Sequence, residues 1–140
     1  MKTENVSLSQ YQALSEFRYS IRKFLHFSEN AARAAGLEPQ QHQLLLAVKG
    51  FAGEGGGPTI GYLAERLQLR HHSTVELIDR MEQHRMVYRR VGEEDRRSVL
   101  VGLTKSAENL LKSLSNQHIS EIRQMGPDLV AALQKVLGEL

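Results

Sequence analysis

The side chains best suited to chemistry are arginines gathered in one stretch of the chain. Of the twelve arginines, eight lie between positions 66 and 97: Arg66, Arg70, Arg80, Arg85, Arg89, Arg90, Arg96 and Arg97. The net charge is +2, and residues 60–105 account for all of it, with nine Lys/Arg against seven Asp/Glu. Planar guanidinium groups form paired hydrogen bonds with phosphates and guanine edges. The charge pattern therefore fits a nucleic-acid partner, and it fits an ion-paired, solvated surface equally well.

The other reactive residue types form no recognisable site. The chain has no cysteine, which excludes disulfides, thiolate nucleophiles and thiolate-bound zinc. His71 and His72 are about 100° apart on a helix, and the other four histidines are scattered, so we expect no metal site. No Ser/His/Asp order or carboxylate pair stands out, and we predict neither enzymatic activity nor a cofactor. The glycines at positions 53–57 lack the lysine of a phosphate loop and are interpreted as a connection.

Hydrophobic periodicity predicts the elements that position these residues. A long helix is expected from about residue 9 to 35, and Pro39 opens a second one. Ile60, Leu63, Ala64 and Leu67 form the apolar face of a short helix. The next helix buries Thr74, Leu77, Ile78 and Met81. Because only three or four residues around Leu69 separate the last two, they predict a helix-turn-helix.

The period then changes from helical to strand-like. Residues 87–91 and 99–103 are rich in β-prone side chains and flank the charged stretch 92–97, which predicts a wing of two strands. Thr104 is a good N-cap for a further helix, which Gly126-Pro127 should break before a last one. The fold class is thus mainly α (α+β), a single domain over residues 1–140 with a winged helix-turn-helix at about 38–103.

The terminal helices, at about 9–35 and 105–140, carry more apolar surface than one small winged helix can cover. Pairing two chains through these helices would bury that surface, so we expect a homodimer. A two-fold dimer places two recognition helices about 34–36 Å apart, matching a pseudo-palindromic DNA site. The side chains expected at this interface are Leu14, Phe17, Ile21, Leu129, Leu133, Val136 and Leu137.

The order of these parts resembles the MarR (multiple antibiotic resistance regulator) family of winged helix-turn-helix transcription factors. The similarity covers residues 10 to 140 and rests on motifs at residues 37–41, 63–67 and 73–81. The most specific motif is Asp95-Arg96-Arg97, with Leu103-Thr104 beginning six residues after it. The resemblance implies a DNA-binding regulator, most often a repressor. It also implies a small-molecule effector pocket between the dimer helices and the DNA-binding lobe.

Three positions depart from the family pattern. Arg85 stands where a glycine usually follows the recognition helix, so it must either adopt a left-handed conformation or shift the helix end. No glycine follows Leu103-Thr104. The recognition helix opens with Arg70-His71-His72-Ser73 instead of a Ser-Pro-Ser-Thr sequence, which indicates a different N-cap and a different base preference.

The residues expected to contact DNA lie at the start of the recognition helix and on the wing. Glu76 fits either a hydrogen bond from cytosine or an ion pair with Arg80 one turn later. The resemblance implies that one wing arginine enters the minor groove, and Asp95 is expected to orient it. The DNA-binding set is Arg70, His71, His72, Ser73, Val75, Glu76, Arg80, Arg90, Arg96 and Arg97.

We therefore expect a cytoplasmic, homodimeric, sequence-specific regulator of transcription that binds double-stranded DNA and responds to a small molecule. The N-terminal segment has no apolar signal region, and no apolar run is long enough to span a membrane. Two other classes stay open. A winged-helix module for protein–protein contact would select no DNA sequence, and a sequence-indifferent DNA-binding protein would show a steep salt dependence without discrimination.

Overall fold

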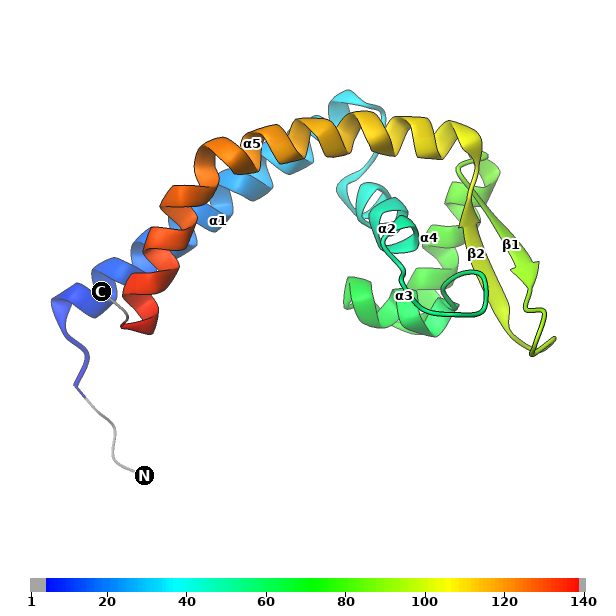
Figure 1. The fold of residues 1–140 in the computed structure, drawn as a ribbon, viewed down its shortest axis with the longest axis horizontal. Helices are drawn as coiled ribbons and strands as arrows, with labels where there is room; N and C mark the ends of the chain where they lie inside the picture. The colour runs from blue at the N-terminus through cyan, green and yellow to red at the C-terminus, as the bar shows by residue number, and fades with distance from the viewer. Residues whose placement is uncertain (1–4, 139–140) are drawn as a thin grey trace. The chain divides into compact units, whose positions relative to one another are not determined.

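The computed structural model describes residues 5–138, which form five helices and two strands (Figure 1). In chain order these are α1 (Leu8–Ala34), α2 (Pro39–Lys49), α3 (Ile60–Leu67), α4 (His71–Gln83), β1 (Val87–Val91), β2 (Val99–Leu103) and α5 (Lys105–Leu137). The chain divides into two compact units. One, the helical unit, comprises Met1–Ala31 and Asn116–Leu140, and the other, the winged-helix unit, comprises Ala32–Ser115.

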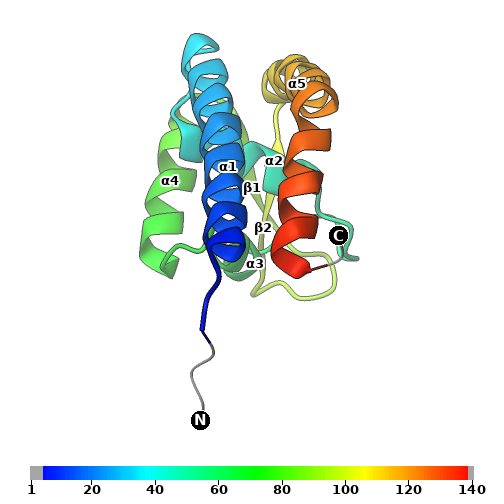
Figure 2. The same ribbon diagram turned by 90° about the vertical axis from the view of Figure 1, so that its left-hand side faces the viewer.

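The helical unit consists of most of α1 and the C-terminal two thirds of α5. The two helices run alongside each other in opposite directions (Figure 2). His118 on α5 meets α1 here: its ring contacts Phe24 and Phe27 edge-on, with centroid distances of 6.1 and 5.5 Å, and its Nε2 lies 2.7 Å from the Ser28 hydroxyl. Ala13, Ser20 and Ala132 are also buried, so small side chains line much of this unit's interior.

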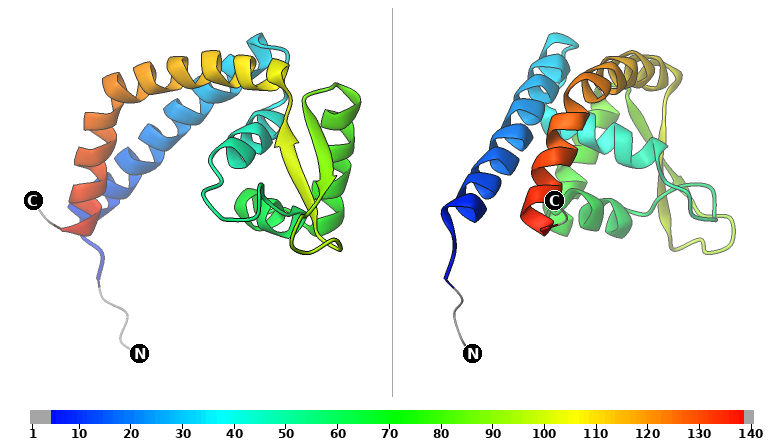
Figure 3. Two further views of the ribbon diagram at one scale, coloured as in Figure 1. Left: turned by 45° about the vertical axis from the view of Figure 1, so that its right-hand side comes forward. Right: turned by 60° about the vertical axis from the view of Figure 1, so that its left-hand side comes forward.

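The winged-helix unit packs α2, α3 and α4 against a two-stranded sheet (Figure 3). The strands pair antiparallel, with Val87 opposite Leu103 and Val91 opposite Val99. Apolar side chains from every element of the unit meet in its core, which contains Leu44, Leu45, Leu63, Ile78, Met81, Val87, Val101 and Leu111. The two strands were predicted at these residues, and the structure confirms a mainly helical fold with a small wing.

Local signals set the helix boundaries, and the start of α2 at Pro39 was predicted from the sequence. Gly36 adopts a φ of +85° after α1, which an L side chain rarely tolerates. Pro39 opens α2, where Gln41 reaches back to accept from the Glu38 backbone N–H at 2.9 Å. The Thr59 hydroxyl caps α3 by accepting from the Tyr62 N–H at 3.1 Å. Thr59 also forms a β-bridge with Leu100, so this position serves both the helix and the sheet edge.

The predicted break at Gly126-Pro127 is wrong, because α5 continues through both residues as one helix of 33 residues. Proline has no backbone N–H, so the carbonyl four residues earlier loses its helical hydrogen bond, but the φ that its ring imposes is close to the helical value. The apolar positions Ile122, Met125 and Leu129 keep helical spacing across the proline. The helical pattern of apolar positions thus continues across the proline.

Within residues 5–138 no helix is long and apolar enough to cross a membrane. The same residues contain no cluster of three or more His, Asp or Glu side chains that could hold a metal ion.

Candidate nucleic-acid interface

Helix α4 presents one buried face and one exposed face. Thr74, Leu77, Ile78 and Met81 are buried, as their spacing predicted, and they attach the helix to the core. Most residues predicted to contact DNA lie on the remaining surface. Arg70, His71, His72, Glu76 and Arg80 are exposed, and Ser73 and Val75 are half-buried at the edges of the core face.

The first turn of α4 is open to an anion. Arg70 is the N-cap residue, and its side chain accepts no hydrogen bond from the helix. The first turn contains no acidic residue. The Thr74 hydroxyl donates to the Arg70 carbonyl at 2.9 Å, which fixes the turn without covering its N–H groups. Because the first N–H groups of a helix have no partner within the helix, this end can bind a phosphate.

The wing holds its two arginines in different ways. The Asp95 carboxylate accepts a hydrogen bond from the Arg97 backbone N–H at 3.0 Å and a weaker one from Arg97 Nε at 3.5 Å. The Arg97 side chain is nevertheless 94% exposed. Arg96 is exposed as well, and no hydrogen bond or ion pair of its side chain is found within residues 5–138. The wing tip therefore offers two guanidinium groups, and one of them lies beside the Asp95 carboxylate.

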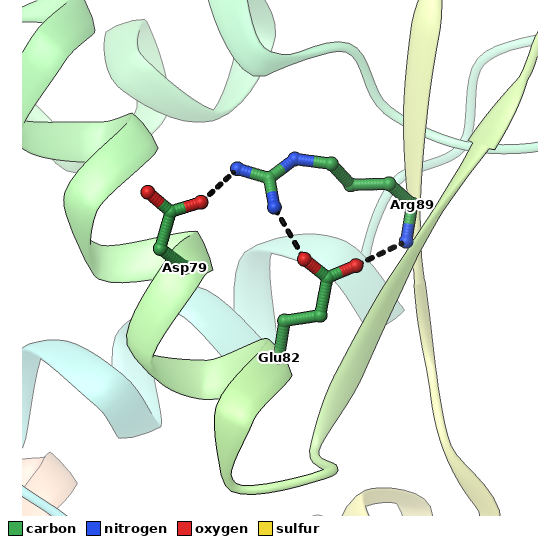
Figure 4. Close-up of polar contacts among 3 residues, drawn as sticks. All are labelled: Asp79, Glu82 and Arg89. Atoms are coloured by element: carbon green, nitrogen blue, oxygen red, sulfur yellow. Dashed lines mark hydrogen bonds and ion pairs between the residues drawn. The ribbon is translucent and has the colours of Figure 1, made fainter.

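Arg89 on β1 joins the wing to the recognition helix (Figure 4). Its Nη1 lies 2.5 Å from Glu82 Oε1 and its Nη2 lies 2.6 Å from Asp79 Oδ1, so one guanidinium bridges two carboxylates of α4. The Arg89 backbone N–H also donates to Glu82 Oε2 at 3.3 Å. Burial is the largest single influence on the Arg89 pKa and lowers it. The hydrogen bonds and negative charges of Asp79 and Glu82 together outweigh burial, so the pKa is raised overall.

Asp79 and Glu82 were not predicted as functional residues from the sequence. A signal for them existed: they are three residues apart, which places both carboxylates on one side of α4. Arg90, the neighbouring arginine that was predicted to contact DNA, donates a hydrogen bond to the Gly56 carbonyl of the glycine-rich connection. Arg90 therefore has a partner inside the winged-helix unit, and its contact with DNA stays a prediction.

The end of α4 is tied to the start of α5. Arg85 adopts a φ of +58°, one of the two alternatives that the sequence predicted, and its N–H donates to the Glu82 carbonyl at 3.0 Å. The Thr104 hydroxyl donates to the Arg85 carbonyl at 2.8 Å and accepts from the Ala107 N–H at 3.2 Å. Thr104 thus caps α5, as predicted, and also holds the turn that follows the recognition helix.

The residues predicted for dimerisation lie on the helical unit. Leu14, Leu133, Val136 and Leu137 are exposed, between 38% and 63%, and Phe17, Ile21 and Leu129 are half-buried. A side chain that stays exposed in a single chain is available to a second one. Their role in dimerisation remains a prediction.

Comparison with known proteins agrees with this geometry. A model of the MarR family matches residues 35–98, from directly after α1 to the end of the wing loop. No curated protein matches the chain in sequence. Among solved structures, AbsC, a MarR family transcriptional regulator from Streptomyces coelicolor, superposes with a TM-score of 0.76 at 22% identity, over 96% of this chain and 93% of that one.

Two structures of MepR from Staphylococcus aureus are also similar. MepR, a transcription regulator of the multidrug efflux pump MepA, gives a TM-score of 0.71 at 19% identity, over 88% of this chain and 94% of that one. The MepR–DNA complex gives 0.61 at 23% identity, over 88% and 96%. The MarR family model thus matches the winged-helix part of this chain, and MarR family regulators share its fold along nearly the whole length.

Proposed function

We propose that this protein is a homodimeric, sequence-specific DNA-binding regulator of transcription. One observation carries the proposal: the exposed, uncapped start of α4 and the arginines of the wing belong to one compact unit. Arg89 ties β1 to α4 within that unit, so both DNA-facing elements are positioned before any DNA arrives. The structure of MepR with DNA supports the same use of this fold, at 23% identity.

The chemistry of the exposed groups supports double-stranded DNA as the partner. Arg70, His71, His72 and Ser73 carry hydrogen-bond donors where a recognition helix reaches base edges and phosphates. Val75 is suited to a thymine methyl group. The Arg96 and Arg97 guanidinium groups are suited to the minor groove or to the adjacent phosphates. No enzymatic step and no cofactor form part of this proposal.

Fluorescence anisotropy on DNA from upstream of the protein's own gene tests the proposal. At about 150 mM salt, we expect at least about 10³-fold preference over a scrambled duplex, since specific regulators discriminate by that factor or more. Tight binding without discrimination would indicate a sequence-indifferent DNA-binding protein. Absence of binding to this duplex and to any selected duplex would favour a protein-interaction module.

The apolar surface of the helical unit supports a homodimer. Large side chains that are exposed along α1 and α5 include Leu14, Leu25, Ile122, Val130 and Leu133. Sedimentation equilibrium of the wild type should give twice the mass of one chain. Leu133→Asp should shift the protein toward monomer, because an unpaired carboxylate in an apolar interface is costly. Gln117→Asp, at an exposed polar position of the same helix, provides the control.

The remaining parts of the function follow from the family resemblance. We propose that the protein represses transcription, that a small-molecule ligand relieves repression, and that it acts in the cytoplasm. A ligand of this kind works only if it binds one spacing of the two lobes better than another. Titration of candidate ligands into the protein–operator complex would reveal it as release of the DNA.

A further inference from the structure

The three carboxylates of α4 have different partners. Asp79 and Glu82 both bind the guanidinium of Arg89, which neutralises much of their charge. Glu76 is exposed, and within the described part of the chain no hydrogen bond or ion pair involves its side chain. Arg80 lies one helical turn away but forms no ion pair with Glu76 within 4.0 Å. Glu76 is therefore the carboxylate that this helix leaves available.

The position of Glu76 on the helix points it away from the core. At about 100° per residue, Glu76 and His72 lie on nearly the opposite side of α4 from the buried residues Leu77, Ile78 and Met81. Glu76 also belongs to the first half of the helix, the part that a helix-turn-helix protein inserts into the major groove. In a DNA complex of the proposed kind, this side chain faces the base edges.

A carboxylate at such a place is costly without a specific partner. The phosphates that flank the groove repel it, so Glu76 weakens binding to DNA in general. A hydrogen bond from a base offsets that repulsion only where the groove offers a donor. The major groove offers two, the N4 amino group of cytosine and the N6 amino group of adenine. Adenine N6 lies beside the acceptor N7, which repels a carboxylate, whereas cytosine has no acceptor in the major groove.

We infer that Glu76 is a specificity-determining residue, which accepts a hydrogen bond from the N4 amino group of one cytosine in each half-site. This inference rests on the proposed DNA-binding function and names what one residue of that interface reads. Glu76 discriminates between base pairs: its carboxylate gains a hydrogen bond at a C·G pair, and at the other three pairs it meets repulsion or finds no suitable donor.

Selection of binding sites from a double-stranded DNA library, randomised over about 24 base pairs to cover two half-sites, tests the inference. The wild type should select cytosine at one position of each half-site. The selected duplex should bind about tenfold more tightly than duplexes with another base pair there. Glu76→Gln should lose the preference at that position alone, since an amide accepts and donates equally well. It should also bind random DNA more tightly than the wild type.

The matched control is Glu65→Gln, which removes one negative charge from an exposed position on α3. It should keep every base preference of the wild type, which separates loss of charge from loss of readout. If Glu76→Gln selected the same bases as the wild type at every position, the assignment of Glu76 would be wrong while the proposed function stood. If the wild type selected no sequence at all, the proposed function would fail and this inference with it.

Discussion

The Arg89 guanidinium on β1 lies 2.5 Å, Nη1 to Oε1, from the Glu82 carboxylate on α4. Asp79 binds the other end of the same guanidinium, and the Arg89 backbone N–H completes the contact with Glu82. Three hydrogen bonds to two carboxylates fix the orientation of β1 relative to α4 as well as the distance between them, because the guanidinium is planar and its donors point in fixed directions. The position of the wing relative to the recognition helix is thus built into the winged-helix unit.

Replacing Arg89 by alanine should lower the free energy of unfolding by about 1 kcal/mol. Arg89 is partly buried, so its pairs are worth more than surface ion pairs, and its loss leaves Asp79 and Glu82 to repel each other. Because its pKa is raised above the ordinary arginine pKa, Arg89 is charged throughout the range from about pH 6 to 9. Loss of the Arg89 proton should therefore cause no loss of stability in that range. Urea denaturation measures the effect. Arg96→Ala should leave the midpoint unchanged, and an equal loss in both variants would contradict a specific role for Arg89.

The Thr104 hydroxyl should stabilise the junction of α4, β1 and α5. Thr104→Val removes the donor to the Arg85 carbonyl and the acceptor for the Ala107 N–H, at nearly constant volume. We expect a loss of about 1–2 kcal/mol in the free energy of unfolding, the range for a lost helix cap. Thr104→Ser keeps the hydroxyl and should recover most of it. Equal stabilities of the valine and serine variants would show that the hydroxyl contributes nothing.

Local patterns made much of the fold predictable. The core face of α4, the positions of the two wing strands and the Thr104 cap each depend on residues close together in the chain, whereas for Arg85 the sequence left two alternatives. Periodicity and turn chemistry report on such short separations. For the same reason, the residues at the start of the recognition helix were named from the sequence.

Contacts that depend on how the elements pack against each other were not predictable in the same way. Arg90 meets Gly56, which is 34 residues away, and nothing in the composition of the glycine-rich connection specifies a partner. Arg89 finds Asp79 and Glu82 only once the strand folds back along α4. The wrong prediction at Gly126-Pro127 has a different origin: both residues disfavour helices locally, but α5 continues through them. Tertiary packing decides the partners of Arg89 and Arg90.

Arg85→Gly should stabilise the winged-helix unit. Arg85 holds a φ of +58°, and the left-handed region costs a side-chain-bearing residue about 1–2 kcal/mol. Part of this gain is offset by the freedom of glycine in the unfolded chain, so we expect a net increase of about 0.5–1 kcal/mol. The control is Arg66→Gly inside α3, which should cost about 1 kcal/mol. A destabilised Arg85→Gly variant would show that the arginine side chain contributes more than the strain.

Pro127→Ala tests the continuity of α5. In a helix interior, alanine restores the missing hydrogen bond and should raise the free energy of unfolding by up to about 3 kcal/mol. Gly126→Ala should add about 1 kcal/mol, because its new methyl group would meet only an ordinary contact, 3.7 Å from Ile122 Cγ2. Both are measured by thermal unfolding at one protein concentration, since association shifts the midpoint. If neither substitution raised the midpoint, a helix break at these residues would be the better description.

Arg97→Ala should weaken binding to the selected operator about tenfold and reduce the slope of log affinity against log salt by about 1. The Arg97 side chain is 94% exposed and its Nε lies 3.5 Å from Asp95 Oδ1, so its charge is available to a phosphate or to the minor groove. Asp95→Asn should cost less, because an amide oxygen still accepts from the Arg97 backbone N–H and only the attraction to the guanidinium weakens. Arg18→Ala on α1, exposed in the helical unit, removes the same charge outside the proposed interface and should change neither quantity. Anisotropy titrations at four salt concentrations separate these cases. If Arg97→Ala bound as tightly as the wild type with an unchanged slope, the assignment of the wing to DNA would be wrong.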